Sequence, residues 1–426
     1  MLWRTVLRSS SAAWLAPLLA AFVAFLLRDD LVANVTAGYW PSVFGAAAFA
    51  LPFVTPACAA AGAWEGSRIA RGNVAAWAPA KGGLAIAWPL LLPVVVLGLL
   101  GMGIAVGFTL TEAAPTGGTP PLGVAGMWLV ILLANAMAGF LLGRKLPLVI
   151  AAPLALILSF VLTAYPATLE PLWLRHMVTG GVNDCCSLDQ TLSWRAVVSA
   201  TVLAAAVILA AALALTATSK RAVRLGATGL LTVGLLGSGA LAYGLPADPV
   251  NARSTTALTC SGSNPQVCVW PELSSDLPTI QRDAADARQR LRRAGLSVPV
   301  KLTMAEHPGA GAQYIGSWDQ ATADNVRIGI AAGLLPANPP ACAAKGDFPG
   351  EVAFGPLTAW LSLTAGASKG EVAGRYGQQE TALAAQIRTT PVAQQRAWFQ
   401  RNEPALHNCT TKPQLKLAGR TAGGAQ

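Results

Sequence analysis

Cysteine is the residue type whose spacing in this sequence most clearly predicts chemistry. Apart from Cys58, which lies in an apolar stretch, the cysteines lie in polar segments: Cys185, Cys186, Cys260, Cys268, Cys342 and Cys409. An even number of such cysteines favours disulfides, which form and persist outside the cytoplasm. We expect Cys260 to pair with Cys268 and Cys342 with Cys409, which leaves Cys185 and Cys186 bonded to each other or elsewhere. A metal site is the alternative, but no C-x-x-C or His/Cys spacing supports it.

A second group of residues combines one acid with two bases at helical spacing. Glu65, Arg68 and Arg71 lie in the polar segment that follows an apolar run ending near Trp64. At this spacing the three side chains would occupy neighbouring faces of a helix just beyond a membrane. One interpretation is a solvated basic loop, and the other is a docking element for a cytoplasmic partner.

Catalytic motifs are scarce in this chain. Glu306-His307-Pro308 lacks the second histidine that a zinc peptidase of the H-E-x-x-H type needs. The phosphate-binding pattern G-x-x-x-x-G-K-[ST] does not occur, so the chain does not hydrolyse ATP by that route. A hydrolase of unfamiliar type that uses Glu351, His307 or Ser362 is a minor alternative. We therefore expect no enzyme, no catalytic residues and no cofactor.

The elements that carry these residues are dominated by long apolar runs without internal charges. A helix of about twenty apolar residues spans the roughly 30 Å hydrocarbon core of a membrane. We predict spans at Ala12–Leu27, Pro41–Trp64, Leu84–Leu110, Pro121–Leu142, Pro147–Tyr165, Ala196–Thr216 and Leu225–Leu245. The chain is therefore expected to cross the cell membrane about seven times.

The positions of the charges predict the orientation of these spans. With a cytoplasmic N-terminus, the inner segments contain Arg4, Arg8, Arg68, Arg71, Lys81, Arg144, Lys145, Lys220, Arg221 and Arg224. The outer loops then contain only Arg28, Arg175 and Arg195 among the basic residues, with most of the acids. Lys and Arg accumulate on the cytoplasmic side. Seven spans from this start would place the residues after Leu245 outside the cell, together with six of the cysteines.

Composition agrees with this class of protein. The chain of 426 residues is 54% hydrophobic and only 12% charged. Its formal charge of +10 is explained by the orientation of the basic loops, so we do not expect nucleic-acid binding. The predicted spans have no ionisable group at mid-membrane, which argues against a proton-coupled carrier.

The predicted organisation is a transmembrane domain at residues 1–245, an extracytoplasmic domain at 246–409 and a disordered tail at 410–426. The fold class is mainly α, with a polytopic helical bundle followed by a small disulfide-containing α or α+β domain. In that domain we expect helices at Leu277–Ala294, Glu351–Leu363, Lys369–Arg388 and Pro391–Leu406, and strands at Val298–Met304 and Val326–Ile330. The first of these helices carries an apolar stripe of Leu277, Ile280, Ala284, Ala287 and Leu291. Trp360 and Trp398 are expected in the core of the domain.

The first 245 residues resemble actinobacterial permeases of the ATP-binding cassette type 2 class. The resemblance rests on the basic amphipathic start, the first span, the segment Trp64-Glu-Gly-Ser-Arg-Ile-Ala-Arg71 and the Ala/Pro-rich stretch after it. It implies that Glu65, Arg68 and Arg71 lie at a coupling surface for an ATPase subunit. Such permeases usually have six spans with both ends inside, so the seventh span and the outer domain depart from the pattern.

Two functions follow from these features. The first is the permease subunit of an ATP-driven transporter, with a separate cytoplasmic ATP-binding subunit, assembled as a homodimer or with a second permease in the lipid bilayer. In that case the outer domain would gate the pathway or bind substrate. The second is a membrane-anchored extracytoplasmic sensor or assembly protein, whose short inner loops would require a partner for signalling.

Overall fold

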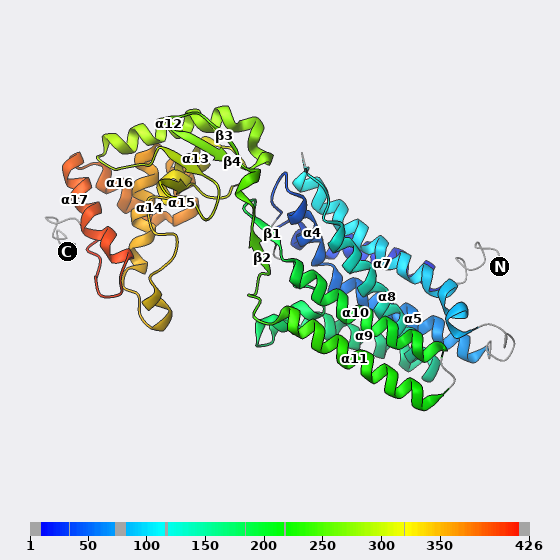
Figure 1. Cartoon of the computed structure of the whole chain (residues 1–426). Helices are drawn as coiled ribbons and strands as arrows, with labels where there is room; N and C mark the ends of the chain where they lie inside the picture. Colours follow the sequence, from blue (N-terminus) through cyan, green and yellow to red (C-terminus); the bar gives the residue numbers. More distant parts are fainter. Residues whose placement is uncertain are drawn as a thin grey trace, which may run out of the picture. The chain divides into compact units, whose positions relative to one another are not determined.

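The computed structural model describes residues 10–33, 35–72, 82–115, 118–183, 185–216, 219–318 and 320–416, without the side chain of residue 345. The chain is mainly helical, at 69%. It divides into two compact units, residues 1–251 and 252–426, so the boundary lies six residues after the predicted one at 245. Figure 1 shows the helices of the first unit and the mixed helices and strands of the second.

The first unit consists of long apolar helices. Their bounds are α2 (Ser11–Leu26), α3 (Arg28–Val32), α4 (Trp40–Ala48), α5 (Leu51–Arg71), α7 (Gly83–Ala113), α8 (Leu122–Lys145), α9 (Leu148–Ala164), α10 (Trp194–Thr216) and α11 (Lys220–Ala242). Among the described residues, five helices are long and apolar enough to cross a membrane, namely α7, α8, α9 with the turn after it, α10 and α11. The α4–α5 pair makes a sixth if its 54° bend is counted within one span, and α2 is shorter, at 16 residues.

Close backbone contact between α5 and α8 forms the centre of this unit. Gly62 and Gly66 of α5 face α8, and Gly139 and Gly143 of α8 face α5. A Cβ atom at Gly139 would lie 2.0 Å from the carbonyl oxygen of Ala59, so only glycine fits there. Each helix thus presents a G-x-x-x-G pattern, which lets membrane helices approach closely.

At one end of the first unit, the segment before α10 packs against the start of α4. It includes the 3-10 turns η1 (Tyr165–Thr168) and η2 (Leu172–Met177) and strand β1 (Gln190–Leu192), which pairs with β2 (Val250–Ala252). Thr36 donates a hydrogen bond to the carbonyl oxygen of Cys186 at 2.9 Å, and Tyr39 donates one to that of Gln190. A Cβ atom at Gly45 would collide with the carbonyl oxygen of Cys185, so α4 and the cysteine pair are in direct contact.

The second unit combines a four-stranded sheet with helices, so it is of the α+β type. The strand order is β3 (Thr259–Ser261), β4 (Gln266–Val269), β5 (Lys301–Thr303) and β6 (Ala312–Tyr314). The first two strands are antiparallel and the other pairs are parallel. Helix α12 (Leu277–Arg293) forms the crossover from β4 to β5, as parallel neighbours require.

The helical core of the second unit agrees in large part with the sequence pattern. Along α12 the buried residues are Leu277, Ile280, Ala284, Ala287 and Leu291, which is the predicted apolar stripe. Helix α14 (Glu351–Ala365) carries the fully buried Trp360, whose ring lies 6.1 Å from that of Trp398 in α17 (Val392–Asn402). The prediction of both tryptophans as core residues is confirmed.

Other predicted elements are wrong. The predicted strand Val326–Ile330 belongs to a helix, α13 (Ala323–Ala332), whose start is capped by the Thr322 hydroxyl. The predicted helix Lys369–Arg388 is two helices, α15 (Lys369–Tyr376) and α16 (Gln378–Arg388), because Gly377 has a φ of 96° and interrupts the helix.

The predicted helix Pro391–Leu406 ends its α-helical part at Asn402, and η6 (Glu403–Leu406) follows. The predicted disordered tail starts at position 410, but residues 410–416 are described in the structure. Residues up to 416 are described, and the carbonyl oxygens of Gln414 and Leu415 accept hydrogen bonds from Asn402 and Trp398. Residues 417–426 lie outside the described residues.

Candidate functional site

The segment predicted as a coupling loop is the last part of helix α5. The helix continues to Arg71, so the predicted loop from Ala63 is helical almost throughout. Glu65 does not lie on a surface, because its side chain is fully buried. Its Oε1 accepts hydrogen bonds from the backbone N–H and the hydroxyl of Ser11, at 2.8 and 3.0 Å. The carboxylate thereby satisfies a backbone donor at the N-terminus of α2, where the helix dipole favours negative charge.

The two arginines are more accessible than the glutamate. The Nη2 atom of Arg68 lies 2.9 Å from Oε2 of Glu65, and its side chain is one-third exposed. Arg71 is exposed at the end of the helix. Ser67, which sequence reasoning missed, donates hydrogen bonds to the carbonyl oxygens of Gly143 and Leu146 at the end of α8. The end of α5 is therefore fixed to both α2 and α8.

The cysteines form three pairs. Cys260 bonds Cys268 across the antiparallel β3–β4 pair, and Cys342 bonds Cys409, with Cα–Cα distances of 4.0 and 6.3 Å. These are the pairs that the sequence spacing favours. Cys185 bonds Cys186, which is the first of the two alternatives left open for them. Cys58 is free and buried in α5.

His176 is a buried polar residue in the segment before α10. One ring nitrogen lies 2.7 Å from the carbonyl oxygen of Pro246 and the other 3.1 Å from that of Gly180. Burial lowers the pKa of His176 below its ordinary value, and the two carbonyl contacts oppose that shift. The histidine joins this segment to the end of the helical unit and lies in no catalytic arrangement among the described residues.

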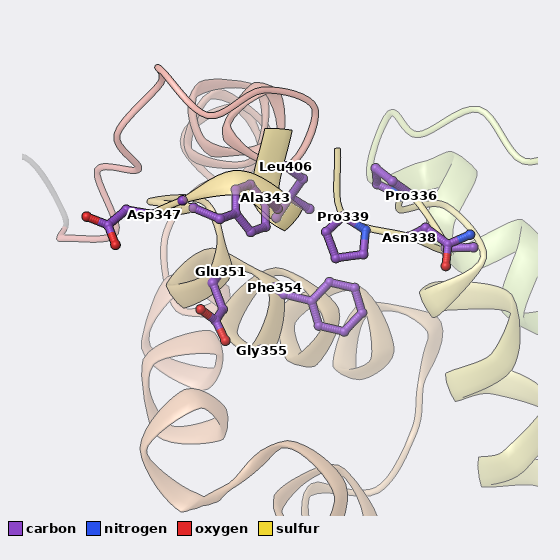
Figure 2. Close-up of a pocket in the computed structure, with 12 residues that line it drawn as sticks. Pro336, Asn338, Pro339, Ala343, Asp347, Glu351, Phe354, Gly355 and Leu406 are labelled. Carbon is purple, nitrogen blue, oxygen red and sulfur yellow. The ribbon is translucent and has the colours of Figure 1, made fainter. Parts of the chain in front are cut away.

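The second unit contains a cavity of about 600 Å³. One wall is the segment 336–348 between α13 and α14, another is the first part of α14, and Leu406 of η6 closes it (Figure 2). In Figure 2 the ring of Phe354 faces Pro339, the Glu351 side chain lies on the same helix as Phe354, and the Asp347 carboxylate points away from these side chains. The lining is therefore apolar and aromatic, with two carboxylates.

The walls of this cavity are held by covalent and close backbone contacts. The disulfide between Cys342 and Cys409 ties the segment 336–348 to the chain just beyond Leu406. A Cβ atom at Gly350 would lie 2.0 Å from the carbonyl oxygen of Ala405, so the start of α14 lies directly against η6. Sequence reasoning found the disulfide but not the cavity, because the lining comes from separate segments of the chain.

The structure does not assemble the hydrolytic residues considered from the sequence. Glu351 and Ser362 both lie on α14, eleven positions apart, which separates them by about 16 Å along the helix. Ser362 is buried, whereas Glu351 is exposed at the cavity. Within the described ranges, no three His, Cys, Asp or Glu side chains lie close enough to hold a metal ion.

Sequence reasoning also passed over a G-x-S-x-G match at residues 366–370. A nucleophile of this motif sits on a sharp turn from a strand to a helix. Here the motif joins helices α14 and α15, and the Ser368 hydroxyl accepts a hydrogen bond from the Glu371 N–H as the cap of α15. Ser368 therefore has a structural role.

The geometry defines a helical unit with membrane-spanning properties joined to an α+β unit with a cavity. In comparisons with known proteins, residues 267–409 match a family described as a domain of unknown function (DUF7224). The matched segment begins in β4 and includes the cavity and the Cys342–Cys409 disulfide. Neither the curated proteins nor the solved structures give a significant match.

Proposed function

We propose that the chain is the membrane-embedded permease subunit of an ATP-driven transporter, with ATP hydrolysis in a separate cytoplasmic subunit. The resemblance of residues 1–245 to type 2 permeases motivates this proposal. The five long apolar helices of the described chain, with the α4–α5 pair and α2, would give the seven spans. A homodimer or a pair with a second permease would complete the pathway through the lipid bilayer.

The observation that carries this proposal is the anchored end of α5. Helix α5 ends in two accessible arginines, Arg68 and Arg71. In the same part of the helix, Glu65 is hydrogen-bonded to α2 and Ser67 is hydrogen-bonded to α8. A force applied at Arg68 and Arg71 by an ATPase subunit would therefore move three helices together. Rigid-element motion of this kind is what alternating access requires.

The distribution of charge at the helix ends supports the proposed orientation. The contacts of Ser11 with Glu65, and of Ser67 with Gly143, place the start of α2 and the ends of α5 and α8 at one end of the first unit. That end carries the basic residues Arg68, Arg71, Arg144 and Lys145. Basic residues mark the cytoplasmic side, so this is the end that would meet the ATPase.

The test is purification of the tagged chain from its native host in mild detergent, followed by mass spectrometry and an ATPase assay. A stoichiometric subunit with a phosphate-binding loop is expected. The variant Arg68→Ala/Arg71→Ala should lose that subunit. The matched control Arg221→Ala/Arg224→Ala, at the start of α11, removes the same charge and should retain it. Recovery of the chain without an ATPase, or loss of the subunit in both variants, would contradict the proposed coupling surface.

The cavity of the second unit favours an alternative function. A membrane-anchored sensor or assembly protein needs a ligand-binding module outside the cell, and an apolar cavity with a few carboxylates suits such a module. Purification with extracytoplasmic proteins alone, and without ATPase activity, would favour this alternative.

A further inference from the structure

A groove in the first unit carries an inference that does not depend on the transport proposal. It lies between helices α2, α5 and α9 and has a volume of about 480 Å³. We propose that this groove binds an anionic phospholipid. One acyl chain would lie between the three helices, and the phosphate would lie beside the basic end of α5.

The lining of the groove suits an acyl chain. Apart from Ser11, every residue that lines it is apolar or aromatic. Ala60 of α5 and Ala152 of α9 have small side chains, which leave room between the helices. Leu156 and Ile157 of α9 are 45% and 56% exposed, although both are large and apolar. An apolar surface of this kind marks a contact with lipid or with a partner.

Two tryptophans indicate which end of the groove meets the lipid headgroups. Trp14 lies in the first turn of α2 and is 78% exposed, and Trp64 lies near the end of α5. Tryptophan is enriched where membrane helices reach the headgroups. Leu156, eight positions into α9, lies about 12 Å further along the helix axis from its start. The groove therefore leads from the headgroup level toward the hydrocarbon core.

The side of α5 that lines the groove continues into basic residues. Residues three or four positions apart are neighbours on a helix, so Ala60, Trp64, Arg68 and Arg71 follow one another along one face. The first two line the groove, and the last two lie beyond its end. Arg71 is exposed there. A phosphate at the headgroup end of the groove would thus lie within reach of this face.

The charge balance at this end indicates the sign of the headgroup. Glu65 is the one acid in the sequences of α2, α5, α8 and α9, and Ser11 and Arg68 already bind its carboxylate. Arg144 and Lys145 are exposed at the end of α8, just before α9 begins. Basic sites between membrane helices bind the headgroups of anionic lipids. A zwitterionic lipid would fill the groove without balancing this charge.

The walls of the groove are fixed by contacts within the unit. The Ser11 N–H donates a hydrogen bond to Oε1 of Glu65 at 2.8 Å, which holds α2 against α5. A cluster of buried alanines holds α5 against α9: Ala59, Ala63, Ala151 and Ala155. A preformed site loses less conformational freedom on binding than a flexible one. The groove can therefore retain one lipid that the surrounding bilayer exchanges.

The experiment compares two lipids with the same acyl chains, dioleoyl phosphatidylglycerol and dioleoyl phosphatidylcholine. The full chain is purified in detergent without an ATPase subunit, and native mass spectrometry counts the bound lipids during a titration. We expect one saturable site per chain that binds the anionic lipid at least about tenfold more tightly, because each nearby basic residue contributes about fivefold. The difference should shrink as the salt concentration rises.

A charge variant locates the phosphate. Arg71→Gln should weaken binding of the anionic lipid about fivefold and leave the zwitterionic lipid unchanged. The matched control is Arg224→Gln, which removes an exposed base of α11 outside the groove and should bind as the parent chain does. Equal losses in the two variants would overturn the proposed position of the phosphate.

A volume variant locates the acyl chain. Ala60→Phe fills the groove and should weaken binding of both lipids, whereas Ala222→Phe, at an exposed position of α11, should not. Because Arg71 is exposed, the charge variant keeps the proposal testable if Ala60→Phe does not fold. Equal affinity for the two lipids, or unchanged binding in folded Ala60→Phe, would mean ordinary surrounding lipid only and overturn the proposal. A dimer that dissociates in Ala60→Phe would assign the groove to a second copy and overturn it as well.

Discussion

At the residue scale, Glu65 shows how a unit of long apolar helices accommodates a buried acid. Its carboxylate accepts two hydrogen bonds from Ser11, at the positive end of α2, and pairs with Arg68 on its own helix. A buried charge is tolerated when it is paired and hydrogen-bonded in this way. A functional surface residue would instead be exposed, so the role of Glu65 is to position helices.

Substitutions at Glu65 should therefore reduce stability. Glu65→Ala leaves the Ser11 N–H and Arg68 without their buried partner, and we expect the thermal unfolding temperature in detergent to fall by about 5 to 10 °C. Glu65→Gln keeps an acceptor for Ser11 and should lose less. Arg71→Ala, which changes an exposed side chain of the same helix, is the control and should unfold at the parent temperature. An unchanged temperature for Glu65→Ala would show that the buried contacts carry little energy.

His176 should make the segment before α10 sensitive to acid. Burial lowers the pKa of this histidine, so the folded state favours the neutral ring more than the unfolded state does. The neutral His176 ring therefore contributes stability that is present above the ordinary pKa of 6.5. This stability is lost as the pH falls through the lowered pKa of the folded state. After correction for intrinsic rates, amide exchange of residues 172–186 should be several-fold faster at pH 5 than at pH 7.5.

The pH dependence at His176 has a direct control. His176→Gln can still donate to the Pro246 carbonyl but cannot titrate, so its exchange should change little with pH. His407→Gln, at an exposed histidine paired with Glu403, should leave the acid sensitivity of residues 172–186 intact. Equal pH dependence in the parent chain and in His176→Gln would assign the effect to another group.

At the element scale, the contact between α5 and α8 depends on glycine. Gly139→Ala would place a Cβ atom 2.0 Å from the Ala59 carbonyl, which forces the helices apart. Such overpacking costs about 1 to 3 kcal/mol. Gly126→Ala, on the same helix with nothing within 4 Å, is the matched control. We expect a lower unfolding temperature for the first variant and no loss for the second, and the same temperature for both would contradict close helix contact.

The sequence predicted the elements better than it predicted their contacts. Apolar length located the long helices, and the stripe on α12 agreed residue by residue, because these signals are local. The short run Val326–Ile330 does not distinguish strand from helix, and the Thr322 cap that would have decided it was overlooked.

The candidate sites were harder to predict for a physical reason. Burial of Glu65 depends on Ser11, 54 residues earlier in the chain, and no spacing rule reports such a pair. The cavity likewise joins the segment 336–348 to Leu406, a contact that only the folded unit creates. The G-x-x-x-G patterns of α5 and α8 were the available signal for close packing, and the sequence reasoning did not use them.

At the scale of the whole molecule, the proposed orientation places the basic helix ends of the first unit in the cytoplasm and residues 252–426 outside the cell. The native cysteines report on the outer side, because Cys342 and Cys409 lie in the second unit. In intact cells, a membrane-impermeant maleimide should label them only after treatment with an impermeant reductant.

The proposed cytoplasmic location of the end of α5 is tested with a cysteine introduced there. In a Cys58→Ser background, the cysteine of Arg71→Cys, read out by mass spectrometry of its peptide, should remain unlabelled in intact cells, with or without the reductant. It should be labelled once the membrane is permeabilised. Replacing Val352, on the exposed surface of α14, by Cys gives the matched control and should be labelled in intact cells. Labelling at position 71 before permeabilisation would reverse the proposed orientation, and an ATPase could not then meet Arg68 and Arg71.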